Sequence, residues 1–294
     1  MRSALFIPGD SERKLAKGLG SGADVLLIDL EDSVALDDKS KARATTLAFL
    51  TDAKREKRRP ALYVRVNAFD TELTEDDLAG VMSAAPEGIV LPKSEHGRDV
   101  TRLDAILRVF EAENNLNDGA TRILAIATET AIGALQANTY GRASKRLMGL
   151  TWGAEDLSAD IGALARRKAD GSYRDPYRYA RIQALLGAVA AGVQPIDTVY
   201  PDFRDLDGLK TECQEAALDG FTGKMAIHPA QVPVINAAFT PSAEAVDEAK
   251  RIVDAFEAAD NPGVLALDGV MLDRPHLKKA QSLLARAASV DGET

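Results

Sequence analysis

The sequence predicts an α/β protein that folds as a (β/α)8 TIM barrel with an additional C-terminal helix and arm. Three observations support this prediction: short β-branched apolar runs alternate with longer segments of helical period, eight such runs occur, and each ends in polar or charged residues. The predicted strands are residues 4–8, 25–30, 62–66, 88–92, 123–128, 147–153, 196–201 and 224–229. An open doubly wound sheet is the alternative, but the sequence lacks its Gly-rich GxGxxG turn.

The segments between these strands and after them carry helical patterns. Predicted helices include residues 39–56, 99–113, 176–191 and 205–220, several with polar starts and Gly or Asn near their ends. Residues 166–178 are expected to form a long loop, because Gly, Asp and Pro interrupt the helical period.

The pattern changes after the eighth strand. Residues 242–260 predict a helix, residues 264–272 an extended segment, and a final helix begins near Pro275. We therefore expect a barrel domain at residues 1–240, and a C-terminal helix and arm at residues 241–294 that packs on a neighbouring subunit.

Composition excludes several classes of protein. The 294 residues are 46% hydrophobic with a formal net charge of −9, which disfavours binding to nucleic acid or an anionic membrane. The only cysteine, Cys213, argues for a reducing compartment and is expected to be a small buried side chain. Because no secretory signal and no apolar run of about 18 residues is present, we expect a soluble cytoplasmic protein.

Two carboxylates stand out by their place at strand ends. Glu129 closes the fifth strand and Asp156 follows the sixth, so a barrel would hold them close together, where they repel each other unless a cation joins them. Oxygen ligands without a Cys or His cluster suit Mg²⁺, which leaves coordination positions open for substrate. Alternatively, one carboxylate caps a helix and the other is solvated, and Glu155 could point inward instead of Asp156.

Charged groups end other strands as well. Asp29, Glu31 and Asp32 lie at the end of the second strand, where they either hold the metal's waters or pair with basic groups. Arg65 and Lys93 end the third and fourth strands and provide such groups. A guanidinium suits a carboxylate or a developing oxyanion, although Arg65 could also merely neutralise the nearby acids.

His228 ends the eighth strand, and a lone histidine there is more often a hydrogen-bonding wall residue than a ligand or base. The sequence contains neither a GxSxG motif nor a Walker loop. These absences lower the expectation of acyl-enzyme hydrolysis and of nucleotide hydrolysis.

Nine motifs, in order along nearly the whole chain, closely resemble the citrate lyase beta-subunit-like branch of the HpcH/HpaI aldolase superfamily. They are RSALFIPG, DVLLIDLEDSV, YVRVN, IVLPK, the Glu129-Thr130 strand end, GAEDLSADIG, IDTVYPD, GFTGKMAIHPAQ and LDGVMLDRPHLKKA. The resemblance implies a (β/α)8 barrel with a Mg²⁺ site. It also implies a carbon–carbon lyase that acts on malyl-, citramalyl- or citryl-type 3-hydroxyacyl-CoA thioesters and gives a 2-oxo acid and an acyl-CoA.

The resemblance also implies roles for individual residues. Glu129 and Asp156 would be the metal ligands, and Asp273 would be an acid/base on an arm that reaches over a neighbouring subunit's site. A homo-oligomer follows, either a trimer or a hexamer formed by two trimers. The substrate-binding residues would be Arg65, Lys93, Glu129, Asp32 and His228, and the catalytic residues would be Arg65, Asp273, Glu31 and Asp29.

Two departures from the family pattern and several alternative functions stay open. His228 stands where the fermentative citrate lyase subunit has Asn, and Val270 stands where Lys is common. The alternatives are a citrate lyase beta subunit that acts on a carrier-bound citryl thioester, a CoA-independent class II 2-oxo acid aldolase, and a non-catalytic subunit of a larger complex. Hydrolysis of the thioester also remains possible, because it needs only an added water.

Overall fold

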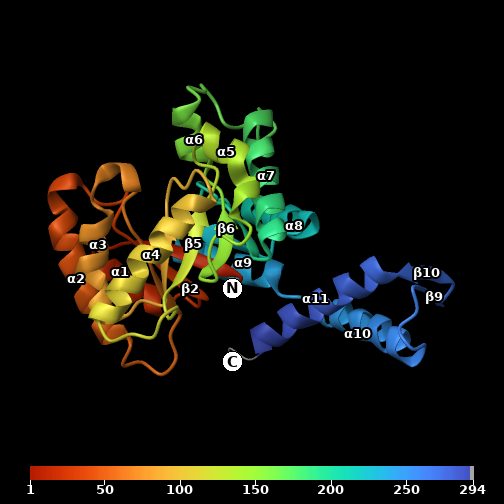
Figure 1. Ribbon diagram of the computed structural model, residues 1–294. Coiled ribbons are helices and arrows are strands. Elements are labelled where there is room, and N and C mark those ends of the chain that lie inside the picture. Colours follow the sequence, from red (N-terminus) through yellow and green to blue (C-terminus); the bar gives the residue numbers. More distant parts are fainter. Residues whose placement is uncertain (292–294) are drawn as a thin grey trace. The chain divides into compact units, whose positions relative to one another are not determined.

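Eight parallel strands form a closed barrel in the order β1 to β8, with β1 paired to β8 (Figure 1). The computed structural model describes residues 1–291 of the chain. The strands are β1 Ser3–Pro8, β2 Val25–Asp29, β3 Ala61–Arg65, β4 Gly88–Leu91, β5 Arg122–Ile126, β6 Leu147–Thr151, β7 Gln194–Asp197 and β8 Gly223–Ala226. The predicted (β/α)8 barrel is therefore confirmed, with strands that end up to four residues earlier than expected.

The strands form because their aliphatic residues can be buried on both faces of a parallel sheet. All five residues of β2 are buried, and Val25 and Leu27 belong to the apolar core inside the barrel. The register pairs Asp29 with Pro8 on one side and with Arg65 on the other. This pairing places an acid and a base next to each other at the carboxyl end of the barrel.

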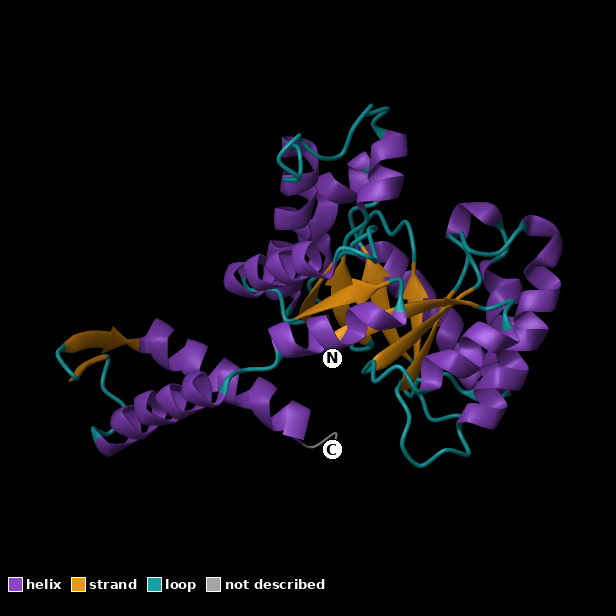
Figure 2. Cartoon of the chain, turned by 180° about the vertical axis from the view of Figure 1, so that it is seen from behind, coloured by secondary structure: helices purple, strands orange, loops and turns teal. Residues whose placement is uncertain are grey.

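Helices cover the outside of the barrel (Figure 2). They are α1 Glu12–Leu19, α2 Lys39–Ala53, α3 Thr74–Val81, α4 Gly97–Glu113, α5 Ala131–Gln136, α6 Ala154–Asp160, α7 Asp175–Ala191, α8 Leu206–Asp219 and α9 Val232–Phe239. Short 3₁₀ helices occur at Leu36–Asp38, Phe69–Thr71, Met82–Ala84, Ala137–Tyr140 and Pro229–Gln231. None of the helices in residues 1–291 is both long enough and apolar enough to cross a membrane.

Two local predictions are refined by the structure. The long loop between strands six and seven covers residues 161–174 rather than 166–178, because α7 already begins at Asp175. Pro176 lies in the first turn of α7, where its missing N–H breaks no helical hydrogen bond. Cys213 is a free, buried thiol, as expected.

The chain divides into two compact units, Met1–Asn236 and Ala237–Thr294. In the second unit, α10 Ala243–Ala258 packs against α11 Arg274–Asp291. The expected extended segment is an antiparallel hairpin of β9 Val264–Leu267 and β10 Val270–Asp273. Its two-residue turn, Asp268-Gly269, has positive φ at both positions, as a tight hairpin turn requires.

Candidate active site

A cavity of about 410 Å³ opens at the carboxyl end of the barrel strands, which is where (β/α)8 barrels place their chemistry. Residues at or shortly after the ends of every strand except β4 contribute to its lining. These residues include Phe6, Asp29, Asp32, Arg65, Glu129, Gly153, Asp156, Thr198, Met225 and Ile227. The cavity is therefore walled by charged groups on one part and by apolar side chains on another.

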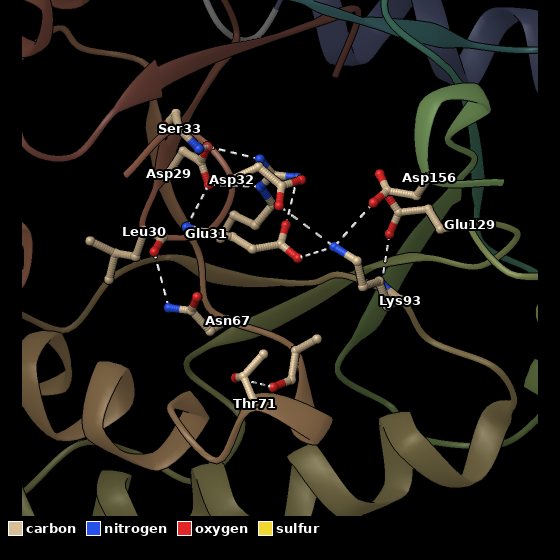
Figure 3. A network of polar contacts seen from close by, with 12 residues as sticks. Asp29, Leu30, Glu31, Asp32, Ser33, Asn67, Thr71, Lys93, Glu129 and Asp156 are labelled. Carbon is tan, nitrogen blue, oxygen red and sulfur yellow. Dashed lines mark hydrogen bonds and ion pairs between the residues drawn. The ribbon is translucent and has the colours of Figure 1, made fainter. Parts of the chain in front are cut away.

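Asp29 fixes the Arg65 guanidinium at this mouth. Both carboxylate oxygens accept from Arg65, at 2.7 Å from Nε and 2.8 Å from Nη2. The same carboxylate accepts from the backbone N–H groups of Glu31 and Ser33 (Figure 3). Burial alone would raise the pKa of Asp29, but the charge and hydrogen bonds of Arg65 outweigh it and lower that pKa. Asp29 is thus an ionised group that positions the guanidinium.

Lys93 connects acids that come from different strands. Its Nζ donates to Glu31 Oε1 and lies 3.2 Å from Asp156 Oδ1 and 3.7 Å from Asp32 Oδ1 (Figure 3). Glu31 Oε2 in turn lies 2.8 Å from Arg65 Nη1. Burial raises the pKa of Glu31 despite these two cations. The acids that follow β2 therefore pair with the basic groups at the mouth, which is one of the two roles expected for them.

Among the acids of this cluster, the negative charge of Glu129 is the least compensated by hydrogen bonds and neighbouring cations. Its side chain is buried, and its Oε2 accepts a hydrogen bond of 2.7 Å from the Lys93 backbone N–H, which positive φ at Lys93 directs toward it. Burial, and then the negative charges of Asp156 and Glu31, raise its pKa to about 8. Without a further cation, Glu129 therefore carries a proton at neutral pH.

Gly153 makes room for the Glu129 side chain. A Cβ atom at position 153 would lie 2.7 Å from Glu129 Cγ and 2.8 Å from Oε1, closer than carbon atoms approach without a shift. Sequence analysis did not single out this glycine. Its place directly after strand six, in the WGAED motif, is the signal that could have identified it.

The carboxylates of Glu129 and Asp156 lie beside each other and fit a Mg²⁺ ion (Figure 3). Within residues 1–291 no cluster of three or more His, Cys, Asp or Glu side chains is arranged to hold a metal. Mg²⁺ needs fewer, since one or two carboxylates commonly hold it while water and substrate fill its other positions. A divalent cation would also remove the repulsion that raises the pKa of Glu129.

Two predicted site residues lie outside this cluster. His228 precedes the short helix Pro229–Gln231, accepts from the Ala230 N–H at Nδ1, and stacks on Phe203 with ring centres 4.7 Å apart. Asp273 ends β10 in the second unit, with Oδ1 2.6 Å from His276 Nδ1. The other seven predicted residues, Asp29, Glu31, Asp32, Arg65, Lys93, Glu129 and Asp156, form one connected network.

A second cavity, of about 520 Å³, adjoins the first. It is lined by Arg13, Lys14 and Lys17 of α1, together with Phe6 and Ile227, which also line the mouth cavity. Sequence analysis did not identify these three cations. The signal that could have found them is the run SERKLAK, which places three basic residues within one helix directly after the first strand.

Comparisons with known proteins agree with this geometry. Residues 2–229 match the family described as HpcH/HpaI aldolase/citrate lyase. The chain is 36% identical to the citrate lyase subunit beta-like protein of Mycobacterium tuberculosis over 98% of its own length and 96% of that protein. It is also 36% identical to the (3S)-malyl-CoA thioesterase of Cereibacter sphaeroides, with 98% and 95% of the two chains covered.

A solved structure carries the same fold. The CitE protein of Mycobacterium tuberculosis in complex with magnesium, acetoacetate and coenzyme A superposes with a TM-score of 0.75 at 34% identity and covers 98% of both chains. The same protein is also described with magnesium and pyruvate. The prediction of a Mg²⁺ cofactor agrees with the magnesium found in these structures of a similar protein. The family resemblance drawn from the nine motifs is confirmed, and the chain belongs to the HpcH/HpaI aldolase/citrate lyase family.

Proposed function

We propose that this chain is a cytoplasmic, Mg²⁺-dependent lyase that cleaves or forms a carbon–carbon bond in a 3-hydroxyacyl-CoA thioester of the malyl, citramalyl or citryl type. One observation carries the proposal. The cavity that holds Glu129, Asp156 and Arg65 shares Phe6 and Ile227 with a second cavity lined by three cations. A metal-binding pocket for a small acid thus adjoins a pocket suited to a phosphate-bearing group.

Glu129 and Asp156 would hold Mg²⁺ at the small-acid end of the substrate. When bound, the ion supplies Lewis-acid stabilisation of the substrate's hydroxyl and carboxylate oxygens. Glu129 follows β5, Asp156 lies in the first turn of α6 after the neighbouring strand β6, and both line the cavity, so the open positions of the ion would face the cavity. Lys93 would keep Asp156 oriented through its 3.2 Å contact.

Arg65 would offset the negative charge that develops on oxygen as the bond breaks. Asp29 takes two of its five N–H groups, and Glu31 and Asp32, the latter at 3.6 Å, both face Nη1, so one N–H of Nη2 remains to bind substrate. Because Asp29 and the Phe6 ring, 4.8 Å from the guanidinium carbon, hold the group in place, it needs little reorganisation during the reaction.

The cationic cavity would bind the phosphates of coenzyme A. Arg13, Lys14 and Lys17 present three positive charges on one helix, and phosphate oxygens pair strongly with such groups. Phe6 and Ile227 form the border between the two cavities, where the thioester would pass from one to the other. His228, which lines the same cavity, would contribute to its wall.

Asp273 would supply or remove the proton at the carbon next to the thioester. In the cleavage direction, the substrate hydroxyl gives its proton to water and the carbon–carbon bond breaks to a 2-oxo acid and a thioester enolate. The carboxyl group of Asp273 then protonates the enolate carbon and regains its proton from water. Asp273 lies in the second compact unit of the chain. We propose that this unit acts on the mouth of a neighbouring copy, so that the enzyme works as a trimer or hexamer.

Thioester hydrolysis is the second candidate function. It is favoured by the 36% identity to a protein described as (3S)-malyl-CoA thioesterase. The same pocket would serve both reactions, since hydrolysis needs the same substrate and metal and only a water molecule as an additional reactant. An aldolase that needs no CoA would instead leave the cationic cavity unused.

The test is an assay of the purified protein with Mg²⁺ and with malyl-, citramalyl- and citryl-CoA offered separately. We expect release of glyoxylate, pyruvate or oxaloacetate from one of them, and loss of release in Asp156→Ala. Release of free CoA and the intact hydroxy acid would identify the thioesterase instead. If neither product forms while Mg²⁺ and pyruvate still bind, the proposed lyase acting on a free CoA thioester is wrong.

The action of Asp273 on a neighbouring copy can be tested by mixing two inactive variants. Asp273→Asn lacks the acid/base and Asp156→Ala lacks a metal ligand, so each homo-oligomer is expected to be inactive. In randomly mixed oligomers, about a quarter of the sites combine an intact metal site with an intact neighbouring arm. Recovery of about that fraction of activity supports the proposal, whereas activity that never exceeds either parent contradicts it.

A further inference from the structure

Lys39 is a buried cation that the proposed function leaves without a role. It is the first residue of α2, and only 9% of its surface is exposed. Its Nζ donates hydrogen bonds of 2.7 Å to the backbone carbonyls of both Leu30 and Glu31. These carbonyls belong to residues 29–32, the acidic segment at the end of β2. Lys39 therefore holds the backbone of this segment, whereas the cations at the mouth contact its carboxylates.

Neither helix α2 nor the core explains a lysine at this position. A helix begins more favourably with an acidic than with a basic residue, because the N-terminal end of its dipole is positive. Burial lowers the pKa of Lys39, and the charges of nearby acids, first Asp77 and then Asp29, offset only part of that effect. Within residues 1–291, the hydrogen bonds of this ammonium group all go to the acidic segment. The place of Lys39 is thus better explained by that segment than by the helix that it begins.

The two carbonyls would have hydrogen-bond donors even without Lys39. Leu30 O also accepts from Asn67 Nδ2 at 3.0 Å, and Glu31 O also accepts from the Val34 N–H at 3.1 Å (Figure 3). Because one partner satisfies a buried carbonyl, loss of the ammonium group would leave neither oxygen unpaired. The hydrogen bonds of Lys39 therefore restrict the position of the acidic segment beyond what the fold requires.

The acidic segment is connected directly to Arg65. The Leu30 N–H donates to the Arg65 carbonyl at 2.9 Å, and Asp29 accepts from Nε and Nη2 of the guanidinium. Glu31 Oε2 lies 2.8 Å from Nη1. Since Asp29 and Glu31 set the direction of the guanidinium, a displacement of the segment would also displace the N–H group that is left for substrate.

We propose that Lys39 is a positioning residue for the reaction, which fixes the Arg65 guanidinium by holding the acidic segment. The inference rests on the proposed function, in which Arg65 offsets the charge that develops on oxygen. A shift of about 1 Å in a catalytic group can lower a rate about 100-fold, so the effect of Lys39 should be measurable in kcat. The proposed metal ligands, Glu129 and Asp156, receive no hydrogen bond from Lys39, so Mg²⁺ affinity should be retained.

The test is a double-mutant cycle in which thioester turnover is followed by release of the 2-oxo acid or of free CoA. Lys39→Met removes the charge and keeps a long side chain, whereas Arg65→Lys keeps a charge but loses the two-point contact with Asp29. We expect Lys39→Met to lower kcat about 10- to 100-fold in the wild type, but no more than about twofold in Arg65→Lys, because the two residues act through one group.

Lys41→Met is the matched control, because Lys41 is an exposed lysine on the same helix. It should change kcat by no more than about twofold in either background. The melting temperature and Mg²⁺ affinity of Lys39→Met should stay close to those of the wild type, since no carbonyl is left unpaired. The affinity for pyruvate in the presence of Mg²⁺, measured by calorimetry, should fall about tenfold, again only where Arg65 is intact.

Three results would overturn the inference. They are equal losses of kcat in the two backgrounds, a lower melting temperature with unchanged kcat, and an equal effect of Lys41→Met. If no thioester is turned over but pyruvate binds, the proposed lyase is wrong, and the pyruvate affinities of the same variants decide the inference by themselves. A wild type that neither turns over a thioester nor binds pyruvate contradicts both proposals.

Discussion

Two ionic clusters lie at opposite ends of the barrel strands and differ in how fully their charges are compensated. The base cluster is formed by Arg146, Glu111, Asp104 and Asp118, with Arg146 directly before β6. Arg146 bonds both oxygens of Glu111, at 2.6 and 2.7 Å, and also reaches Asp104 and Asp118. Glu111 further accepts from two backbone N–H groups. Burial raises the pKa of Glu111, but these hydrogen bonds outweigh it and lower that pKa.

The mouth cluster, formed by the seven connected residues of the candidate site, is compensated unevenly. Asp29 is as well satisfied as Glu111, but buried Glu129 keeps one hydrogen bond and a pKa of about 8. A buried carboxyl group with a single hydrogen bond and no paired cation lowers the stability of the fold, and such groups are common where a ligand binds. We expect this difference if the base cluster serves the fold and the mouth cluster binds the proposed Mg²⁺ ion.

The largest expected effect comes from removing the uncompensated acid. Glu129→Gln keeps the shape of the side chain but removes a proposed metal ligand, so we expect kcat to fall about 1000-fold, the loss of several kcal/mol of stabilisation. The melting temperature without Mg²⁺ at pH 8.5 should stay equal or rise, because a buried charge is gone. Steady-state kinetics and calorimetry check both effects.

Glu155→Gln is the matched control for this comparison. Glu155 adjoins Asp156 in sequence and also lines the mouth cavity, but its side chain is 49% exposed and pairs with Arg166 rather than with the mouth cluster. We expect kcat to change by no more than about twofold, since exposed ion pairs contribute little. A larger loss in Glu155→Gln than in Glu129→Gln would contradict the assignment of the mouth cluster.

The second effect tests the base cluster. Arg146→Met leaves Glu111 buried without its cation, so the free energy of unfolding should fall by about 3–5 kcal/mol. kcat should be unchanged at temperatures where the variant is folded. Arg108→Met is the control, because Arg108 pairs with the same Asp104 and Asp118 from a side chain that is 63% exposed. Its unfolding free energy should change by about 0.5 kcal/mol at most.

The third effect is on the pH dependence of the free energy of unfolding, to which the two clusters contribute with opposite sign. Because the pKa of Glu129 is raised to about 8, the folded protein without metal binds more protons than the unfolded chain, and stability falls as pH rises from about 4.5 to 8. Glu111, with its lowered pKa, contributes stability above its ordinary range and loses it as pH falls below. Denaturant unfolding across this range checks the two signs.

The affinity for Mg²⁺ should depend on pH through the protonation of Glu129. Since binding requires ionised Glu129, affinity should rise about tenfold per pH unit below pH 8 and level off above it. Titration calorimetry at several pH values measures this slope, and Glu129→Gln should remove it. A slope that persists in the variant would assign the proton to another group.

The smallest effect is expected from filling the space beside the Glu129 side chain. Gly153→Ala forces the Glu129 side chain to shift, and we expect Mg²⁺ affinity to fall about tenfold, as for other residues that orient metal ligands. Gly141→Ala is the control, because its added Cβ would have a nearest contact of 3.9 Å and the backbone φ of −56° suits alanine. Equal affinities in the two variants would show that Gly153 has no such role.

Much of the fold follows from local patterns. The eight apolar runs predict the strands, since only a parallel sheet covered on both faces buries such short, continuous runs. The polar residues after each run predict where charged groups gather, because parallel strands bring their carboxyl ends together. The hairpin at Asp268-Gly269 is also visible in the sequence, although we had expected one extended segment there.

The sequence by itself determined which charged residues lie at or shortly after the strand ends, and hence the seven members of the mouth cluster. Only the tertiary structure decided that Asp29 holds Arg65, that Glu129 stays nearly uncompensated, and that Arg13, Lys14 and Lys17 line a cavity next to the mouth. The physical reason is that position along a strand is local, whereas register, burial and the distance between charges depend on segments far apart in the chain. The pKa of a carboxyl group depends on those distances, so its chemistry emerges only when the barrel closes.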